Sequence, residues 1–280
     1  MELEEAERKI GAFITMLGDE EKAASTVRKY AGDVRIFLAW CRKSGIGTIT
    51  QRTLKAYKES LCARRKLSGC NSVIISLNKF FGMFAEERLR LKSIPRQRKT
   101  SLDEIFSPGE YRLLLERAKD CGSERLYFIM RLLASSGIRV GELAFITVSV
   151  LESGRCVVRN KGKSRDIFIP AELCEELKGY CTRHGIRQGV VFRSKRHPDR
   201  MLDKSQIWRE MDRLGKAAGL PKGCVHAHSF RHFFAKQYYQ KYKDLCELAD
   251  ILGHSSIETT RIYTRSTTSE KMERIAGLHL

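Results

Sequence analysis

Residues 226–265, near the C-terminal end of the chain, carry side chains that suit phosphodiester chemistry. His228 and Arg231 stand three residues apart, so on a helix they share one face, and His254 and Tyr263 follow them. Arginine is always charged and donates two parallel hydrogen bonds to an anion, while an activated tyrosine hydroxyl acts as a nucleophile. These residue types predict a site that holds a phosphate and attacks it without a metal ion.

Two upstream residues can complete such a site. Arg139 follows a predicted helix end at Gly137 and directly precedes a helix start, so its side chain and the following amides are expected to face one phosphate. Lys161 lies at the tip of a predicted hairpin, where an ammonium group can protonate a leaving oxygen. Each residue alone has an ordinary structural explanation, and the prediction depends on the whole set.

The elements that position these residues are mostly helical. In the first hundred residues, apolar side chains recur at three- and four-residue spacing and predict four helices, with N-caps at Ser25 or Thr26, at Thr50 and near Ser68. Further helices follow from Ser107, which opens a capping box with proline at the first helical position. The N-terminal part is therefore predicted to be a four-helix bundle.

Strand patterns are confined to the second part of the chain. Residues 156–169 predict a β-hairpin, and residues 190–193 predict a third strand. A short helix is expected from Gly141, and Leu252-Gly253 ends a helix directly before His254. Ser255-Ser-Ile-Glu258 has the spacing of a capping box that opens the helix of Tyr263. The predicted fold class is mainly α with a small antiparallel β-sheet.

Composition divides the chain and indicates its partner. The formal net charge is +19, and residues 22–99 alone hold 19 basic and four acidic residues. Such an excess of positive charge favours a polyanion such as nucleic acid. Residues 92–106 contain Pro95 and a basic cluster, which predicts a linker. The expected division is a helical DNA-binding domain at 1–92, a basic linker at 93–106 and a catalytic domain at 107–280.

Five motifs in a fixed order are more specific than any one residue. They are S-G-I-R-V-G-E-L at 136–143, N-K-G-K-S-R at 160–165, H-S-F-R-H at 228–232, L-G-H at 252–254 and T-T-R-I-Y-T at 259–264. On these motifs the chain resembles the tyrosine recombinases, the family of phage integrases and Xer-type site-specific recombinases. The resemblance covers the second domain, and the first looks like the family's helical (SAM-like) core-binding domain.

The resemblance implies a role for each motif residue. Arg139 and Arg231 would clamp the scissile phosphate, Lys161 would be the general acid, and Tyr263 would form a 3′-phosphotyrosyl link. His228 would accept a proton and bind the phosphate. In addition, His254 would hydrogen-bond the phosphate and Glu142 would support the site. No metal or cofactor is expected, because the covalent link conserves the energy for rejoining.

Other basic residues are predicted to contact the DNA backbone. They are Arg64, Arg65, Lys66, Arg96, Arg98, Lys99, Lys163 and Arg165. His226 and His232 are expected to be structural. Tyr238, Tyr239 and Tyr242 are rival nucleophiles on residue type alone, but they have no neighbouring L-G-H motif.

The expected partner is double-stranded DNA, synapsed by four copies of the chain or by a mixture with a partner recombinase. The C-terminal residues Met272, Ile275, Leu278 and Leu280 are expected to dock on a neighbouring protomer. Nine scattered cysteines without a C-x-x-C pair and no signal peptide or apolar span predict a cytoplasmic protein. A type IB topoisomerase and a DNA-binding protein without catalysis remain as alternatives.

Overall fold

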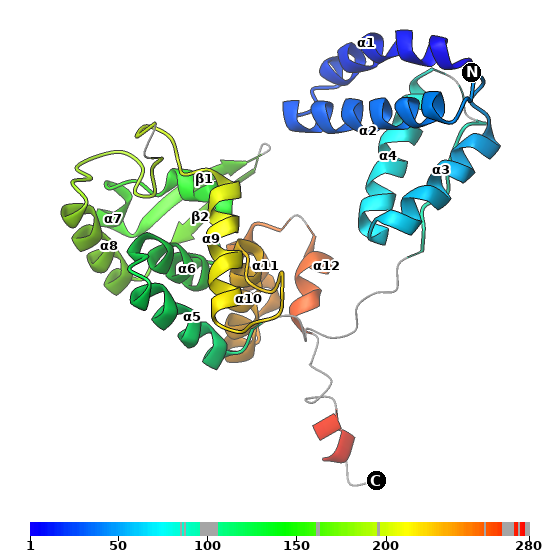
Figure 1. Cartoon of the computed structure of the whole chain (residues 1–280). Helices are drawn as coiled ribbons and strands as arrows, with labels where there is room; N and C mark the ends of the chain where they lie inside the picture. The colour runs from blue at the N-terminus through cyan, green and yellow to red at the C-terminus, as the bar shows by residue number, and fades with distance from the viewer. Residues whose placement is uncertain are drawn as a thin grey trace. The chain divides into compact units, whose positions relative to one another are not determined.

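The computed structural model describes residues 1–84, 86, 88–95, 106–160, 163–194, 197–254, 256–264, 272–273 and 275–277, without the side chains of Arg159, Asn160 and Lys163. The chain divides into two compact units, Met1–Arg98 and Lys99–Leu280 (Figure 1). Each unit has its own apolar core. Most of the predicted linker lies outside the described residues, and the exact domain boundaries stay a prediction.

The first unit consists of the four predicted helices. They are α1 (Leu3–Asp19), α2 (Ala24–Lys43), α3 (Gln51–Arg64) and α4 (Leu67–Met83). Helix α1 packs on α2, and α4 packs on both α2 and α3. Thr50 caps α3 as predicted, with its side chain accepting a hydrogen bond from the Thr53 amide at 3.2 Å. The predicted cap of α2 at Ser25 or Thr26 was wrong, because α2 begins after Ala23. Helix α4 begins after Lys66, close to the predicted start near Ser68, and neither Ala23 nor Lys66 makes a side-chain cap bond.

The second unit is helical apart from one hairpin. In chain order it contains α5 (Pro108–Asp120), α6 (Glu124–Ser136), the 3₁₀ helix η1 (Val140–Phe145), α7 (Val150–Ser153), β1 (Arg155–Asn160), β2 (Lys163–Phe168), α8 (Ala171–Arg183), α9 (Lys204–Ala217), α10 (Ala227–Tyr242), α11 (Leu245–Leu252), α12 (Ile257–Thr260) and the 3₁₀ helix η2 (Arg261–Thr264). Strands β1 and β2 pair antiparallel, with Cys156 opposite Ile167. The fold class is therefore mainly α with a small antiparallel sheet, as predicted.

Two predicted elements differ in the structure. The residues predicted as a third strand make only isolated bridges, Val190 with Thr147 and Arg193 with Met201. The helix expected from Gly141 is the tighter 3₁₀ helix η1, which begins one residue earlier. A continuous ladder needs consecutive paired residues, and these bridges are single. No helix among the described residues is long and apolar enough to cross a membrane.

The elements that carry the motif residues pack against one another in the second unit. Helix α10 contacts α6, α11 and η2, while α11 contacts α12 and β2. A small apolar cluster at this junction is formed by Ala235, Leu248, Leu252 and Tyr263. Helices α6 and α11 both end at a left-handed glycine, Gly137 and Gly253, as predicted. Their last carbonyls thus point into one region.

Candidate active site

Arg231 is the most buried charged side chain of the site. Only 1% of its surface is exposed. Its Nη1 donates to the Gly137 carbonyl at 2.5 Å, and its Nη2 donates to the Leu252 carbonyl at 2.6 Å. Burial and the nearby charge of Arg139 lower the pKa of Arg231 to about 10, so the group is still cationic at neutral pH. Arg231 therefore connects the C-terminal ends of α6 and α11 by hydrogen bonds and places a positive charge between them.

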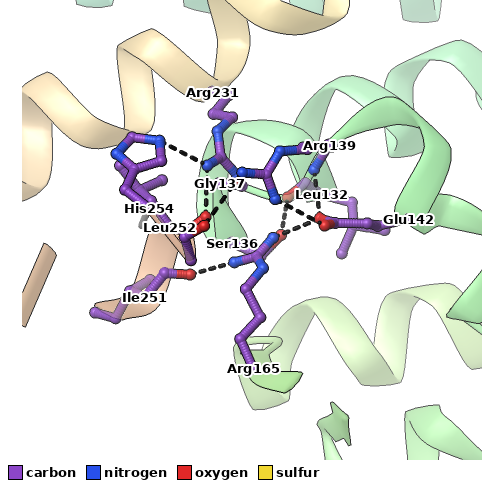
Figure 2. A network of polar contacts seen from close by, with 11 residues as sticks. Leu132, Ser136, Gly137, Arg139, Glu142, Arg165, Arg231, Ile251, Leu252 and His254 are labelled. Carbon is purple, nitrogen blue, oxygen red and sulfur yellow. Dashed lines mark hydrogen bonds and ion pairs between the residues drawn. The ribbon is translucent and has the colours of Figure 1, made fainter. Parts of the chain in front are cut away.

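Three arginines, Arg139, Arg165 and Arg231, bind three successive carbonyls at the end of α11 and are called here the arginine cluster (Figure 2). Arg165 donates to Ile251, Arg231 donates to Leu252 and Arg139 donates to Gly253 at 3.4 Å. The last carbonyls of a helix carry partial negative charge and have no partner within the helix. The three guanidinium groups satisfy them, and this fixes the backbone directly before His254.

Glu142 supports this cluster as the only acid in it among the described residues. It is 3% exposed and accepts hydrogen bonds from the Arg139 amide at 2.7 Å, from Arg139 Nη1 at 3.1 Å and from Arg165. Burial alone would raise the pKa of Glu142, but the Arg139 amide and the charge of Arg165 outweigh it and hold the pKa below its usual range. The Arg139 amide is therefore occupied by Glu142, and the contact of a phosphate with the Arg139 side chain and the amides that follow it stays a prediction.

Arg165 was predicted to contact DNA, which stays a prediction, and in the structure its side chain lies largely buried beside Glu142. Its side chain is 9% exposed and is paired with Glu142. Its guanidinium points inward to the Ile251 carbonyl, and its buried Nε has no hydrogen-bond partner. Little of this side chain is exposed to solvent. Its structural effect is to hold Glu142 and the end of α11 together.

His254 is held in one tautomer by its two neighbours. Its Nε2 lies 3.1 Å from Arg231 Nη2, and its Nδ1 lies 2.8 Å from Thr260 Oγ1. A guanidinium can only donate, so Nε2 must be the unprotonated acceptor and Nδ1 must carry the proton. Burial and the charge of Arg231 lower the pKa of His254 to about 4, which favours this neutral form. In this form Nε2 has no proton to donate to a phosphate.

Tyr263 lies in η2. Its ring is part of the small apolar cluster, and its hydroxyl group is hydrogen-bonded to a histidine. The residue is 3% exposed, and its hydroxyl lies 2.7 Å from His232 Nδ1. Burial raises the pKa of Tyr263 to about 12, although the charges of Arg231 and Arg139 act in the opposite direction. The sequence predicted His232 to be structural and did not predict its contact with Tyr263, although its position four residues after His228 places the two histidines on the same helical face.

The other two histidines of α10 differ in role. His226 is the N-cap, with its Nδ1 accepting a hydrogen bond from the Ser229 amide at 3.1 Å, as expected for a structural residue. His228 is exposed, and its ring meets that of His232 edge to face, with centroids 4.3 Å apart. Partial burial of the ring and the charge of Arg231 lower the pKa of His228. His228 thus has a free face at the edge of the site.

Some predicted site residues lie elsewhere or outside the described residues. Five predicted residues lie wholly or partly outside the described part of the chain, namely Lys161, Arg96, Arg98, Lys99 and the side chain of Lys163. Arg64, Arg65 and Lys66 are exposed at the connection between α3 and α4. The predicted cap Ser255 is also outside, and the residue that precedes α12 is Ser256, which makes no side-chain cap bond.

The rival tyrosines are not in the arginine cluster. Tyr238 donates a hydrogen bond to Glu247, and burial together with that carboxylate raises its pKa further than that of Tyr263. The ring of Tyr242 packs on Tyr238 with centroids 4.7 Å apart, and the ring of Tyr239 lies under the Lys243 ammonium. At Tyr263, by contrast, the charges of Arg231 and Arg139 oppose the rise in pKa that burial causes.

Replacing Gly253 with alanine is expected to disturb the arginine cluster. Gly253 has φ +61°, and an added Cβ would lie 2.4 Å from Arg165 Cδ. A left-handed alanine costs about 1–2 kcal/mol by itself, and the displacement of Arg165 adds to it. Gly185→Ala is the matched control, because Gly185 also has φ +61° but has no atom within 4 Å of its added Cβ. Urea unfolding should show a larger loss for Gly253→Ala, and equal losses would contradict the packing argument.

Known proteins are similar to this chain over most of its length. Residues 104–270 match the model of the phage integrase family. Tyrosine recombinase XerA of Pyrococcus furiosus is 31% identical over 278 residues, which cover 96% of this chain and 93% of that protein. Tyrosine recombinase XerD of Rhizobium meliloti is 26% identical and covers 91% of this chain and 89% of its own length.

Solved structures agree with the sequence relatives. The crystal structure of XerA recombinase aligns with a TM-score of 0.54 at 26% identity, covering 98% of this chain and 99% of its own. XerH site-specific recombinase bound to palindromic difH substrate aligns with a TM-score of 0.73 at 20% identity, covering 91% and 80%, and shows the same fold. The chain therefore belongs to the phage integrase family and is a tyrosine recombinase of the Xer type, an enzyme of site-specific recombination.

Proposed function

We propose that the chain cleaves and rejoins double-stranded DNA with Tyr263 as the nucleophile. The observation that carries the proposal is the placement of the Tyr263 hydroxyl, which lies 2.7 Å from His232 Nδ1 on α10, the helix that also carries Arg231. A phosphodiester gathers negative charge on its non-bridging oxygens as it is attacked. Fixed cations at that position stabilise the transition state, each typically by roughly 2.7–4 kcal/mol.

The proposed reaction has two reversible halves. The Tyr263 oxygen attacks phosphorus, the bond to the 5′-oxygen breaks, and a 3′-phosphotyrosyl link forms. Lys161 protonates the leaving 5′-oxygen, and Arg139 and Arg231 bind the non-bridging oxygens. A 5′-hydroxyl from the same or another strand then attacks the link and releases the tyrosine. His228 contacts the phosphate from its exposed edge of the site.

The DNA-free geometry implies that His254 changes partner when a phosphate arrives. Its Nε2 accepts from Arg231 Nη2 and so cannot donate to a phosphate oxygen. A phosphate placed between the two residues would take over the Arg231 donor. His254 would then carry its proton on Nε2, or on both nitrogens, and hydrogen-bond the phosphate. The anion itself favours this change, because a neighbouring negative charge raises a histidine pKa.

Double-stranded DNA is the proposed partner, with recombination by four protomers. Solved relatives include XerH bound to difH and a lambda integrase tetramer bound to a Holliday junction. In this chain, exposed Arg64, Arg65 and Lys66 lie on the strongly basic first unit, where they would bind phosphates. Met272 and Ile275 are 67% and 69% exposed and fit the proposed docking of the C-terminal segment on a neighbour, whereas Leu278 and Leu280 lie outside the described residues.

A pool of nicked duplexes tests this function. The pool is randomised over about two helical turns, and each duplex carries a nick that lets the cleaved fragment leave, so that rejoining stops. The wild-type chain should form a denaturant-resistant DNA adduct, and sequencing of the trapped DNA should return one preferred site. Adducts spread over unrelated sequences would favour a type IB topoisomerase. Salt-sensitive binding without any adduct would favour a binding protein without catalysis.

A further inference from the structure

The hydroxyl of Tyr263 is held by one ring nitrogen of His232. The oxygen lies 2.7 Å from His232 Nδ1, and the two ring centroids are 5.4 Å apart. Among the described residues, no second hydrogen bond to this hydroxyl is seen. His228, which the family resemblance suggests as proton acceptor, contacts the ring of His232 and makes no hydrogen bond to Tyr263 among those residues. The nearest proton acceptor to the nucleophile is therefore His232.

The His232 ring is in the protonation state that a base needs. Burial, together with His228, His226, Arg231 and His254, lowers the pKa of His232 to about 4, so the ring is neutral near pH 7. Tyr263 keeps its proton there, because its pKa is raised to about 12. The phenol consequently donates, Nδ1 accepts, and the remaining ring proton is on Nε2.

We propose that His232 is the general base that takes the proton from Tyr263 as the tyrosine attacks phosphorus. The inference rests on the proposed function, because it needs Tyr263 to be the nucleophile. It transfers the proton-accepting role from His228 to His232 and leaves His228 as a phosphate ligand. His228, the more exposed ring, then binds the anion, and His232, the half-buried ring, accepts the proton of the Tyr263 hydroxyl.

The proton transfer is balanced in both directions. As the bond from Tyr263 Oη to phosphorus forms, the phenolic proton passes to His232 Nδ1, the bond to the 5′-oxygen breaks, and the proposed acid Lys161 protonates that oxygen. In rejoining, the 5′-hydroxyl attacks, its proton returns to Lys161, and His232 returns the proton to the departing Tyr263. A phenol that is bonding to phosphorus becomes far more acidic, so a base of low pKa is sufficient in the transition state.

The variant His232→Asn tests whether His232 acts as a base or only positions the Tyr263 hydroxyl. An asparagine amide oxygen can accept the hydrogen bond near the Nδ1 position, but it cannot take the proton. Full-length variant and wild type are compared on the nicked duplex selected from the randomised pool, by the rate of adduct formation. We expect a loss of roughly 10²–10⁴-fold. His184→Asn is the matched control, because that histidine contacts Glu124 on other helices and should react like wild type.

The pH profile gives a readout that a structural role would not change. Without its base the variant must lose the proton to solvent, so its rate should rise roughly tenfold per pH unit between about pH 6 and 9. The wild-type rate should be nearly flat over this range. His232→Gln is the second variant if His232→Asn does not fold, since its amide cannot take a proton either. The wild-type profile needs no variant at all.

Each outcome decides the proposal. A His232→Asn rate equal to wild type with a flat profile would overturn it, and so would a wild-type rate that itself rises tenfold per pH unit. If the wild type forms its adduct on Tyr263 and either of these two results is found, only the proposed role of His232 is overturned, and the proposed function stands. No adduct on any duplex, or an adduct on another residue, would instead overturn the proposed function and this inference with it.

Discussion

Tyr263→Phe is expected to abolish the covalent protein–DNA adduct and to leave DNA binding close to that of the wild type. The change removes one oxygen, and phenylalanine has no group that can attack phosphorus. The arginines proposed to bind phosphate and the basic first unit are untouched, so the electrostatic attraction to DNA should be unchanged. Adduct formation on the selected nicked duplex and a binding titration at one fixed salt concentration measure the two properties.

The variant should fold normally, which makes the test direct. The ring of Tyr263 packs with Ala235, Leu248 and Leu252, and phenylalanine keeps that apolar contact. The lost hydrogen bond to His232 costs about 1 kcal/mol. Thermal unfolding should therefore show only a small decrease in stability.

Tyr238→Phe provides the matched control. Tyr238 lies on α10 in the same unit, and its hydroxyl likewise donates one hydrogen bond, to Glu247. The control loses the same atom and should retain the adduct. An adduct that persists in Tyr263→Phe and disappears in Tyr238→Phe would show that the nucleophile is on α10 instead of η2.

The sequence predicted the elements better than the contacts between them. Helix ends depend on local backbone geometry, so Thr50, Gly137 and Gly253 were identified correctly from residue type and spacing. The 3₁₀ form of η1 was not predicted, because the sequence pattern indicated a short helix without distinguishing its type. Residues 190–193 have strand-forming composition, but their neighbours supply only single bridges.

Within the site, the sequence indicated which residue types assemble but not the direction of each side chain. Arg165 and Arg139 both lie within a motif and both pair with Glu142, yet the Arg165 side chain is 9% exposed and that of Arg139 is 39% exposed. That difference arises from contacts between segments far apart in the chain, β2 with α11, which no local pattern records. The contact between His232 and Tyr263 has the same origin.

Arg231→Ala is expected to lose both activity and stability. The substitution removes a proposed phosphate ligand and leaves the buried Gly137 and Leu252 carbonyls without their donor. Each unsatisfied buried group costs about 1–3 kcal/mol, so a loss on the order of 3 kcal/mol in the free energy of unfolding is expected. Adduct formation should fall by roughly a hundredfold or more beyond the effect of partial unfolding.

Arg231→Lys should fail as well, which separates geometry from charge. A lysine ammonium keeps the positive charge, but it is a compact group and cannot span two diverging carbonyls and His254 as the planar guanidinium does. Arg125→Ala is the control for stability alone, because Arg125 pairs with Glu210 at 2.8 Å between α6 and α9 and touches no residue of the arginine cluster. Urea unfolding and adduct rates are measured for all three variants.

The comparison with Arg139→Ala completes the argument. Arg139 is 39% exposed, its contact with the Gly253 carbonyl is long at 3.4 Å, and Glu142 keeps the Arg139 amide and Arg165 as donors when the Arg139 side chain is lost. Its loss should therefore lower the adduct rate about as much as the loss of Arg231 but cost less stability. Two arginines with one proposed chemical role would then differ only in what they contribute to folding. If Arg231→Ala instead unfolds at the wild-type urea concentration, its buried contacts do not hold α6 and α11 together. If it also forms adduct at the wild-type rate, Arg231 is not a phosphate ligand.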